Sequence, residues 1–251
     1  MRLLVPLVAD PRAPLSRAHP LARIAAGFVV MLGLFITVDV VTSAIVITAL
    51  ALAIALSGLP PRTLAIRAVP LLLSALGIGF FNAVFGTTGP AGGAAIALRL
   101  VGISIAGVLA IATVDPTELA DALVQHLHAP PRFVVGALAA YRLFPLFSRE
   151  WDTLGLARRA RGIEADRTIV ARLAAFPPRT FGLLVAAIRR ATRLALAMDA
   201  RGFGAMACRT LARPRAIGTG DVALIASALG VVVIATATSV ALGTWRPLFT
   251  F

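Results

Sequence analysis

Side chains that could do chemistry are few in this sequence of 251 residues, and they are scattered. The histidines are His19, His126 and His128, and a separation of two positions points the last pair to different faces of a helix. Cys208 is the only cysteine, so no internal disulfide can form. We therefore expect neither a metal site nor a bound cofactor.

Three carboxylates, Asp115, Glu118 and Asp121, lie close together in the sequence. An enzyme would need such acids to converge with a base or a metal ligand. Asp115 is also a good N-cap, followed by Pro116 at the first helical position and Glu118 at the third. Helix capping and solvation therefore account for all three. If these acids did converge on a site, the chain would be an integral membrane enzyme with its site at the cytoplasmic face, and this is one alternative function.

All 24 basic residues are arginines, because the sequence contains no lysine. A P-loop needs a lysine beside the nucleotide phosphates, and Schiff-base enzymes need one as their nucleophile. The chain by itself therefore cannot be a conventional P-loop ATPase.

The composition is more apolar than a water-soluble domain of this length can accommodate. Hydrophobic residues make up 59% of the chain and the mean hydropathy is +0.92, whereas soluble domains contain roughly 45–50% apolar residues. A core of this size cannot bury so much apolar surface, and lipid is the solvent that accepts the excess. The composition predicts an all-α integral membrane protein.

A hydrocarbon core about 30 Å thick requires about 20 apolar residues per helix. The stretches that meet this requirement are residues 24–38, 40–56, 69–85, 91–114 and 222–242. Asp39 alone separates the first two, which predicts a tight helical hairpin, and the glycine-rich residues 86–93 predict the turn between the third and fourth. Arg99 lies inside a span, so we expect it to face another helix, a wet cavity or the interface.

The loop charges predict the orientation. Arginines precede the first span and lie between the second and third, at positions 2, 12, 17, 23, 62 and 67. The turns at Asp39 and at residues 86–93 carry no positive charge. By the positive-inside rule, the N-terminus lies in the cytoplasm and those two turns lie outside, and the chain crosses the membrane several times.

Residues 115–215 differ from the spans, because they contain 16 arginines and eight acidic residues. They are too polar to cross lipid, and their pattern is helical. We therefore divide the chain into residues 1–114, with four transmembrane helices, residues 115–215, with about three cytoplasmic helices, and residues 216–251, with the last transmembrane helix.

Prolines predict the limits of the cytoplasmic helices. One long helix is expected over residues 132–161, with a kink or break at Pro145. Another is expected over residues 179–201, after Pro177 and Pro178. The last helix has an apolar stripe at helical spacing, formed by Phe181, Leu184, Val185, Ile188, Ala191, Ala195 and Met198. Its first four residues are expected to pack on the other cytoplasmic helix or on a partner, and packing within this chain alone is an equal alternative.

Both long helices are expected to end in the same tripeptide, Ala160-Arg161-Gly162 and Ala200-Arg201-Gly202. An arginine in the last turn faces the negative end of the helix dipole, and the glycine lets the chain turn away. One such tripeptide would be an ordinary C-cap. Two copies on successive helices favour a docking role, because each would present a rigid guanidinium fork to a partner.

With these motifs the sequence resembles the transmembrane T component of energy-coupling factor (ECF) transporters, the EcfT/CbiQ/BioN family, which carries two such Ala-Arg-Gly motifs. Residues 15–23 resemble the segment before the first span, with Arg23 where a lysine is usual. Residues 113–119 resemble the start of the family's coupling domain, which consists of its cytoplasmic helices. Residues 141–145 resemble the Arg-x-x-Pro element of the long helix, although Tyr141 departs from the usual small or apolar residue.

The resemblance implies that the chain lies in the plasma membrane of a prokaryote. It also implies a division of labour in which two ABC-type ATPase subunits bind the Ala-Arg-Gly motifs on the cytoplasmic side. The T component also holds a substrate-binding S component, which delivers a vitamin or a metal ion. ATP hydrolysis then belongs to the partners, and the chain itself is not an enzyme. The sequence does not indicate the transported substrate.

A third alternative is a lipid-sensing protein whose arginines contact anionic headgroups. This alternative accounts for scattered arginines but not for two matched helix ends. Nucleic-acid binding is not expected, because membrane topology and docking account for the positive charge.

Overall fold

The computed structural model describes residues 14–58, 61–86, 89–163, 168–203 and 213–245, and the regular elements of this part of the chain are α-helices. They are α1 (Pro14–Arg17), α2 (Pro20–Ile36), α3 (Val40–Ser57), α4 (Pro61–Phe85), α5 (Gly89–Ala112), α6 (Pro116–His126), α7 (Pro131–Ala160), α8 (Ile169–Ala200) and α9 (Thr219–Ala241). The predicted all-α fold is confirmed. The chain forms two compact units, one of Met1–Ala122 with Arg215–Phe251 and the other of Leu123–Pro214.

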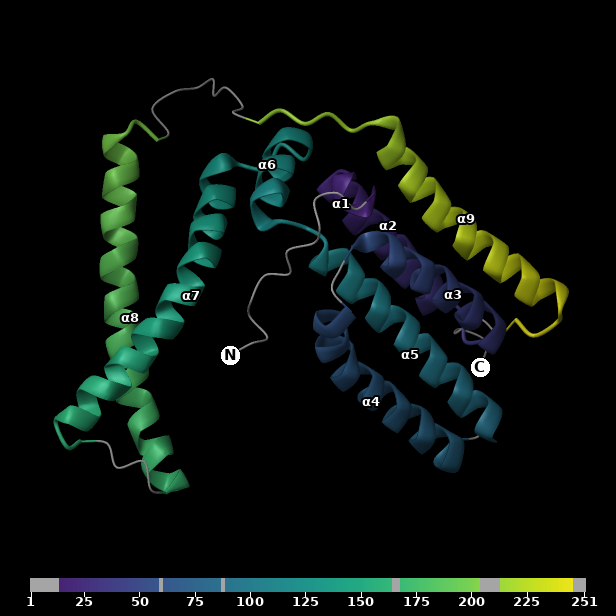
Figure 1. The fold of residues 1–251 in the computed structure, drawn as a ribbon, viewed down its shortest axis with the longest axis horizontal. Helices are drawn as coiled ribbons and strands as arrows, with labels where there is room; N and C mark the ends of the chain where they lie inside the picture. Colours follow the sequence, from purple (N-terminus) through teal and green to yellow (C-terminus); the bar gives the residue numbers. More distant parts are fainter. Residues whose placement is uncertain (1–13, 59–60, 87–88, 164–167, 204–212, 246–251) are drawn as a thin grey trace. The chain divides into compact units, whose positions relative to one another are not determined.

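The first unit is an apolar helical bundle in which α2, α3, α5 and α9 pack together and α4 packs along α5 (Figure 1). Its core is formed by Val30, Leu34, Val46, Leu50, Ala106, Leu109, Ala112 and Ala235. Four helices of the described chain, α3, α4, α5 and α9, are long and apolar enough to cross a membrane. The remaining predicted span, residues 24–38, corresponds to α2, a shorter apolar helix of 17 residues.

The turn at Asp39 connects three helices of this bundle. Asp39 is the N-cap of α3 and accepts a hydrogen bond from the backbone N–H of Thr42 at 2.8 Å. The same carboxylate oxygen accepts a hydrogen bond from the Ser239 hydroxyl of α9 at 2.6 Å. The predicted tight hairpin between α2 and α3 is confirmed, and its turn is also attached to α9.

Arg99 of α5 faces the end of α2. Its Nε donates to the carbonyl of Leu34 at 2.8 Å, and its Nη2 donates to the carbonyl of Phe35 at 2.5 Å. The guanidinium also lies over the Phe35 ring, 5.2 Å from the centroid. The last carbonyls of a helix have no partner within the helix, and a cation is favourable there. Arg99 therefore faces another helix, one of the three alternatives that we expected for it.

Small residues let α4 and α5 approach closely. A Cβ atom added at Gly79 would lie 2.5 Å from the Cβ of Ala97 and 2.9 Å from the carbonyl oxygen of Gly93. A Cβ atom added at Gly93 would lie 2.5 Å from the carbonyl oxygen of Gly79. Membrane helices commonly associate through such small residues, because lipid supplies little hydrophobic drive between them.

Replacing Gly79 with leucine is therefore expected to separate α4 from α5. The added side chain would meet backbone atoms that cannot move aside, and overpacking of this kind costs about 1–3 kcal/mol or more. The matched control is Gly77→Leu on the same helix, because a Cβ atom there meets nothing within 4 Å. The midpoint temperature of thermal unfolding in detergent should be lowered by Gly79→Leu and not by Gly77→Leu. An equal effect of both changes would contradict the close contact.

The second unit contains the two long helices, α7 and α8, and α6 begins in the first unit and ends in the second. Asp115 accepts a hydrogen bond from the N–H of Thr117 at 2.6 Å, so the predicted start of α6 is confirmed. Helix α7 runs unbroken through Pro145, and its axis bends near its middle (Figure 1). The proline therefore produces the predicted kink and not a break.

The predicted start of the last cytoplasmic helix is wrong. We expected it to begin at Arg179, but α8 begins at Ile169 and includes Pro177 and Pro178. Packing against α7 explains the extension, because the ring of Phe176, just before the prolines, lies 5.4 Å from that of Trp151. The helix bends in its first third (Figure 1), as expected where prolines remove backbone hydrogen bonds.

Candidate functional site

The end of α7 is a glycine cap. The N–H of Arg161 bonds to the carbonyl of Arg158 at 3.1 Å, and the N–H of Gly162 bonds to that of Arg159 at 2.9 Å. The N–H of Ile163 also donates to the carbonyl of Arg158, at 3.1 Å. Gly162 has a φ of 69°, a left-handed conformation that glycine adopts without strain.

The end of α8 repeats this arrangement bond for bond. The N–H groups of Arg201 and Phe203 both bond to the carbonyl of Met198, at 3.1 and 3.0 Å, and the N–H of Gly202 bonds to that of Asp199 at 2.9 Å. Gly202 has a φ of 73°. The predicted glycine caps are confirmed at both helix ends, so the two Ala-Arg-Gly tripeptides have the same local geometry.

The residues of both tripeptides, Ala160, Arg161, Gly162, Ala200, Arg201 and Gly202, are exposed. Because α7 and α8 run in opposite directions, the two tripeptides lie at opposite ends of the helix pair (Figure 1). We call them the helix tips. Each tip presents a guanidinium with five donors to its surroundings.

The two helices cross where Arg179 of α8 lies on Trp151 of α7. The guanidinium is 4.5 Å from the centroid of the indole ring, and its Nη2 donates to the carbonyl of Trp151 at 3.0 Å. Gly155, one turn further along α7, is buried, and a Cβ atom there would collide with Arg179. Glycine at this position therefore makes room for the arginine.

An ion pair joins the two helices further along α8. Nη1 of Arg190 lies 3.1 Å from Oε2 of Glu150, and both side chains are largely buried. The same guanidinium lies 5.9 Å from the centroid of the Phe147 ring. Planar arginine groups stacked on aromatic rings and paired with carboxylates restrict how the helices can slide.

The apolar stripe of α8 lies away from this crossing. Phe181, Leu184 and Ile188 are 67%, 53% and 57% exposed, and Val185 is half-buried. The residues that contact α7 are instead Phe176, Arg179, Gly182 and Arg190. The stripe is therefore largely uncovered in the described part of the chain.

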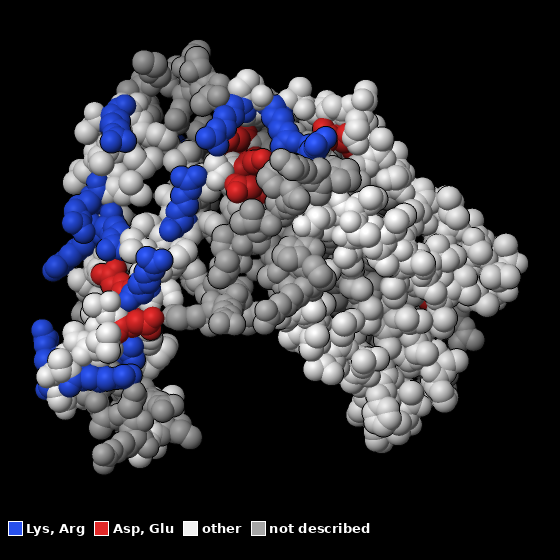
Figure 2. Space-filling view, in the orientation of Figure 1, with Lys and Arg blue, Asp and Glu red and all other residues white. Residues whose placement is uncertain are grey.

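Charge is distributed unevenly over the molecule. Figure 2 shows arginines along the surface of the second unit, whereas the drawn face of the bundle is almost free of charge. Among the side chains that the structure describes in α7, α8 and the helix tips, the exposed arginines are Arg132, Arg142, Arg149, Arg159, Arg161, Arg189, Arg193 and Arg201. The two units therefore differ in surface chemistry, because the drawn face of the bundle is apolar and the second unit is rich in exposed arginines.

Two residues of structural importance were not identified from the sequence. Arg179 was expected only to begin a helix, yet it forms the α7–α8 crossing. Glu118 was assigned to capping and solvation, yet its carboxylate lies 3.3 Å from Arg23 and 3.2 Å from Arg215. No local pattern marks either residue, because their partners lie far away along the chain.

A family model matches most of this chain, and curated relatives match about half of it. Residues 11–210 match the family model CbiQ, described as "Cobalt transport protein". Among curated relatives, the energy-coupling factor transporter transmembrane protein EcfT of Staphylococcus aureus is 34% identical over 133 residues, which are 49% of each chain. The EcfT proteins of Heliobacterium modesticaldum and Bacillus subtilis are 31% and 33% identical, over 57% and 60% of this chain and 56% and 59% of theirs.

The aligned region spans about half the length of these curated relatives. The family model, in contrast, covers the α2–α5 region of the bundle and both long helices of the second unit. The chain therefore belongs to the CbiQ/EcfT family, the transmembrane T components of ECF transporters.

Proposed function

We propose that this chain is the membrane-embedded coupling subunit of an ECF-type ABC importer. It would transmit the ATP-driven motion of two ATPase subunits to an S component that takes up a vitamin or a metal ion. The observation that carries the proposal is the pair of identical, exposed Arg-Gly helix tips at opposite ends of one crossed helix pair.

Two separate tips suit two ATPase subunits, one for each tip. An arginine held at the end of a helix can form bidentate bonds with carboxylates, and these bonds set direction as well as affinity. Hydrolysis of ATP takes place in the partners under this proposal, in agreement with the absence of lysine from this chain. Residues 115–215 form the cytoplasmic coupling region, and the N-terminus lies on the same side of the membrane.

The α7–α8 crossing supports the mechanical part of the proposal. Stacking of Arg179 on Trp151 and pairing of Arg190 with Glu150 hold the helices together near the crossing. A pair locked in this way moves as one body, because packed side chains resist continuous deformation. A displacement at either tip is therefore passed to the whole pair.

The apolar stripe supplies a surface for the S component. Three of the four residues predicted for this contact are more than half exposed, although they belong to an arginine-rich unit outside the bundle. Contiguous exposed apolar residues of this kind mark interaction surfaces. The face of α8 that holds α7 and the face proposed for the S component are thus different.

The experiment that tests the proposal is purification of the tagged chain from its host membrane in mild detergent. ABC-type ATPase subunits and one small membrane protein are expected to co-purify, and ATP is expected to be hydrolysed by the complex and not by the chain alone. Purification without ATPase subunits, together with substrate turnover by the isolated chain, would contradict the proposal and favour a membrane enzyme.

A further inference from the structure

A single carboxylate lies where the chain passes between its two units. The chain leaves the first unit after Ala122 and returns to it at Arg215. Glu118 lies four residues before the departure, and its Oε2 is 3.2 Å from Nη1 of Arg215 and 3.3 Å from Nη2 of Arg23. The departing segment, the returning segment and α2 therefore meet at one oxygen atom.

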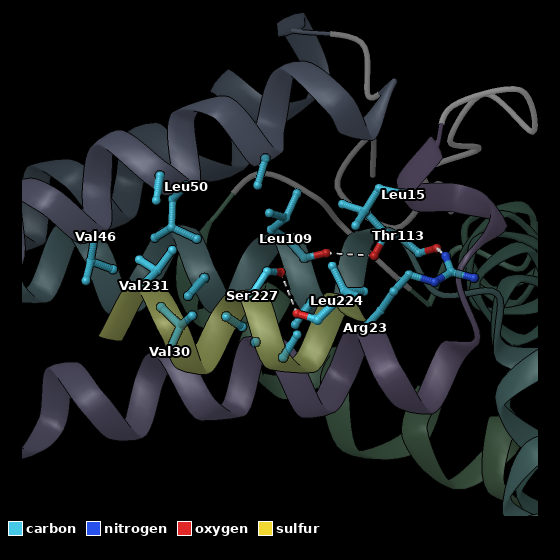
Figure 3. Close-up of a pocket in the computed structure, with 17 residues that line it drawn as sticks. Leu15, Arg23, Val30, Val46, Leu50, Leu109, Thr113, Leu224, Ser227 and Val231 are labelled. Carbon is cyan, nitrogen blue, oxygen red and sulfur yellow. Dashed lines mark hydrogen bonds between the residues drawn. The ribbon is translucent and has the colours of Figure 1, made fainter. Parts of the chain in front are cut away.

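Arg23 is the fixed member of this group. It is only 5% exposed, and its Nη1 donates to the backbone carbonyl of Thr113, just after α5. Figure 3 shows it beside Thr113 and Leu15 at one end of an apolar cavity of about 150 Å³ within the bundle. A buried arginine must keep its partners, because an unpaired buried charge is costly.

Further contacts hold the returning segment, and they are made by residues just before α9 and in its first turn. Nη2 of Arg215 donates to the carbonyl of Arg17, at the end of α1. The Asp221 carboxylate accepts the backbone N–H of His19 at 2.5 Å and that of Gly218 at 2.8 Å. The segment therefore enters the bundle in a defined position beside the start of α2.

We propose that Glu118 is a positioning residue that fastens the departing and returning segments of the coupling region to α2, so that motion of that region reaches the bundle. This inference rests on the proposed function. Gln125 also joins the two segments, because its side-chain amide donates to the carbonyl of Arg213 at 2.9 Å, but that bond does not reach α2. Without Glu118 the two segments could therefore shift relative to α2 and absorb the displacement. With Glu118 joining them, a displacement is passed to α2 and α9 as movement of a fixed body.

Stability alone does not account for the arrangement. The Glu118 side chain is 46% exposed and that of Arg215 is 39% exposed, and ion pairs at such sites contribute little to folding, about 0–1 kcal/mol. Arg23 is buried, but its bond to the Thr113 carbonyl remains when the carboxylate is replaced by an amide, and the amide oxygen can still accept a hydrogen bond from it. This replacement should therefore leave assembly nearly unchanged. Its effect should appear in the efficiency with which hydrolysis drives transport.

The test uses the complete transporter, purified with its partners and reconstituted in proteoliposomes. Glu118→Gln keeps the shape of the side chain and removes its charge. We expect the ATP hydrolysed per substrate molecule transported to rise by about fivefold or more, in the range of typical coupling energies. Arg215→Ala should act in the same direction, and Arg215→Lys should retain most of the coupling.

Asp121→Asn is the matched control, because it removes the same charge from the same helix at a position for which the described structure shows no ion pair. It should couple normally. Unchanged coupling in Glu118→Gln would overturn the inference, and so would a parallel loss of ATPase subunits and transport. Failure of the wild-type chain to bind ATPase subunits would instead contradict the proposed function, so the two failures are distinguishable.

Discussion

Reversing the charge at both helix tips, with Arg161→Glu and Arg201→Glu, is expected to abolish ATPase association and transport while membrane insertion stays intact. Each substitution replaces a donor fork by a carboxylate that repels the acceptor groups of the partner. Loss of one buried, hydrogen-bonded charge pair at an interface costs about 2–5 kcal/mol. Two such losses should lower the affinity beyond detection in a pull-down from detergent-solubilised membranes.

The matched control for this variant is Arg149→Glu with Arg189→Glu. These arginines are also exposed, one on α7 and one on α8, but they lie away from the tips. The net charge changes equally in both double variants, so a general electrostatic effect would appear in both. Normal uptake and normal co-purification of ATPase subunits with the tip variant would refute the docking role.

The second large effect is expected from charges placed in the apolar stripe. Leu184→Glu with Ile188→Glu should release the S component, because carboxylates would have to be desolvated against an apolar partner. An unpaired charge buried in an apolar interface costs several kcal/mol. Co-purification of the S component and substrate uptake should be lost, while the ATPase subunits stay bound.

Leu194→Glu serves as the control for the stripe, because Leu194 is exposed on the same helix but lies outside the stripe. If the S component stays bound to the double stripe variant, the stripe is not its contact surface. Loss of the ATPase subunits as well would indicate that α8 has been disrupted. The tip and stripe variants together distinguish two surfaces, since each should remove one partner and retain the other.

Features that depend on neighbouring residues could be predicted from the sequence. The glycine caps at Gly162 and Gly202 follow from a local conformational preference, and the structure forms both. The capped start of α6 at Asp115 is local in the same sense. The apolar spans depend only on composition over about 20 residues, and each corresponds to a helix of the bundle.

The limits of α8 do not follow from neighbouring residues alone. A proline pair is a strong signal for a helix boundary, yet α8 continues through Pro177 and Pro178. Contacts with α7 on both sides of the pair, through Phe176 and Arg179, stabilise the longer helix. Tertiary packing here outweighs a local preference, as it commonly does for helix propensity.

The sequence alone therefore determined the class of protein, the apolar helices and the two capped arginine tips, because these depend on composition and short-range backbone preferences. Only the tertiary structure decided that Arg99 binds the end of α2, that Glu118 joins Arg23 to Arg215, and that the stripe of α8 faces away from α7. Their partners lie tens of residues away or more, and no local rule reports which distant groups a charged side chain will meet.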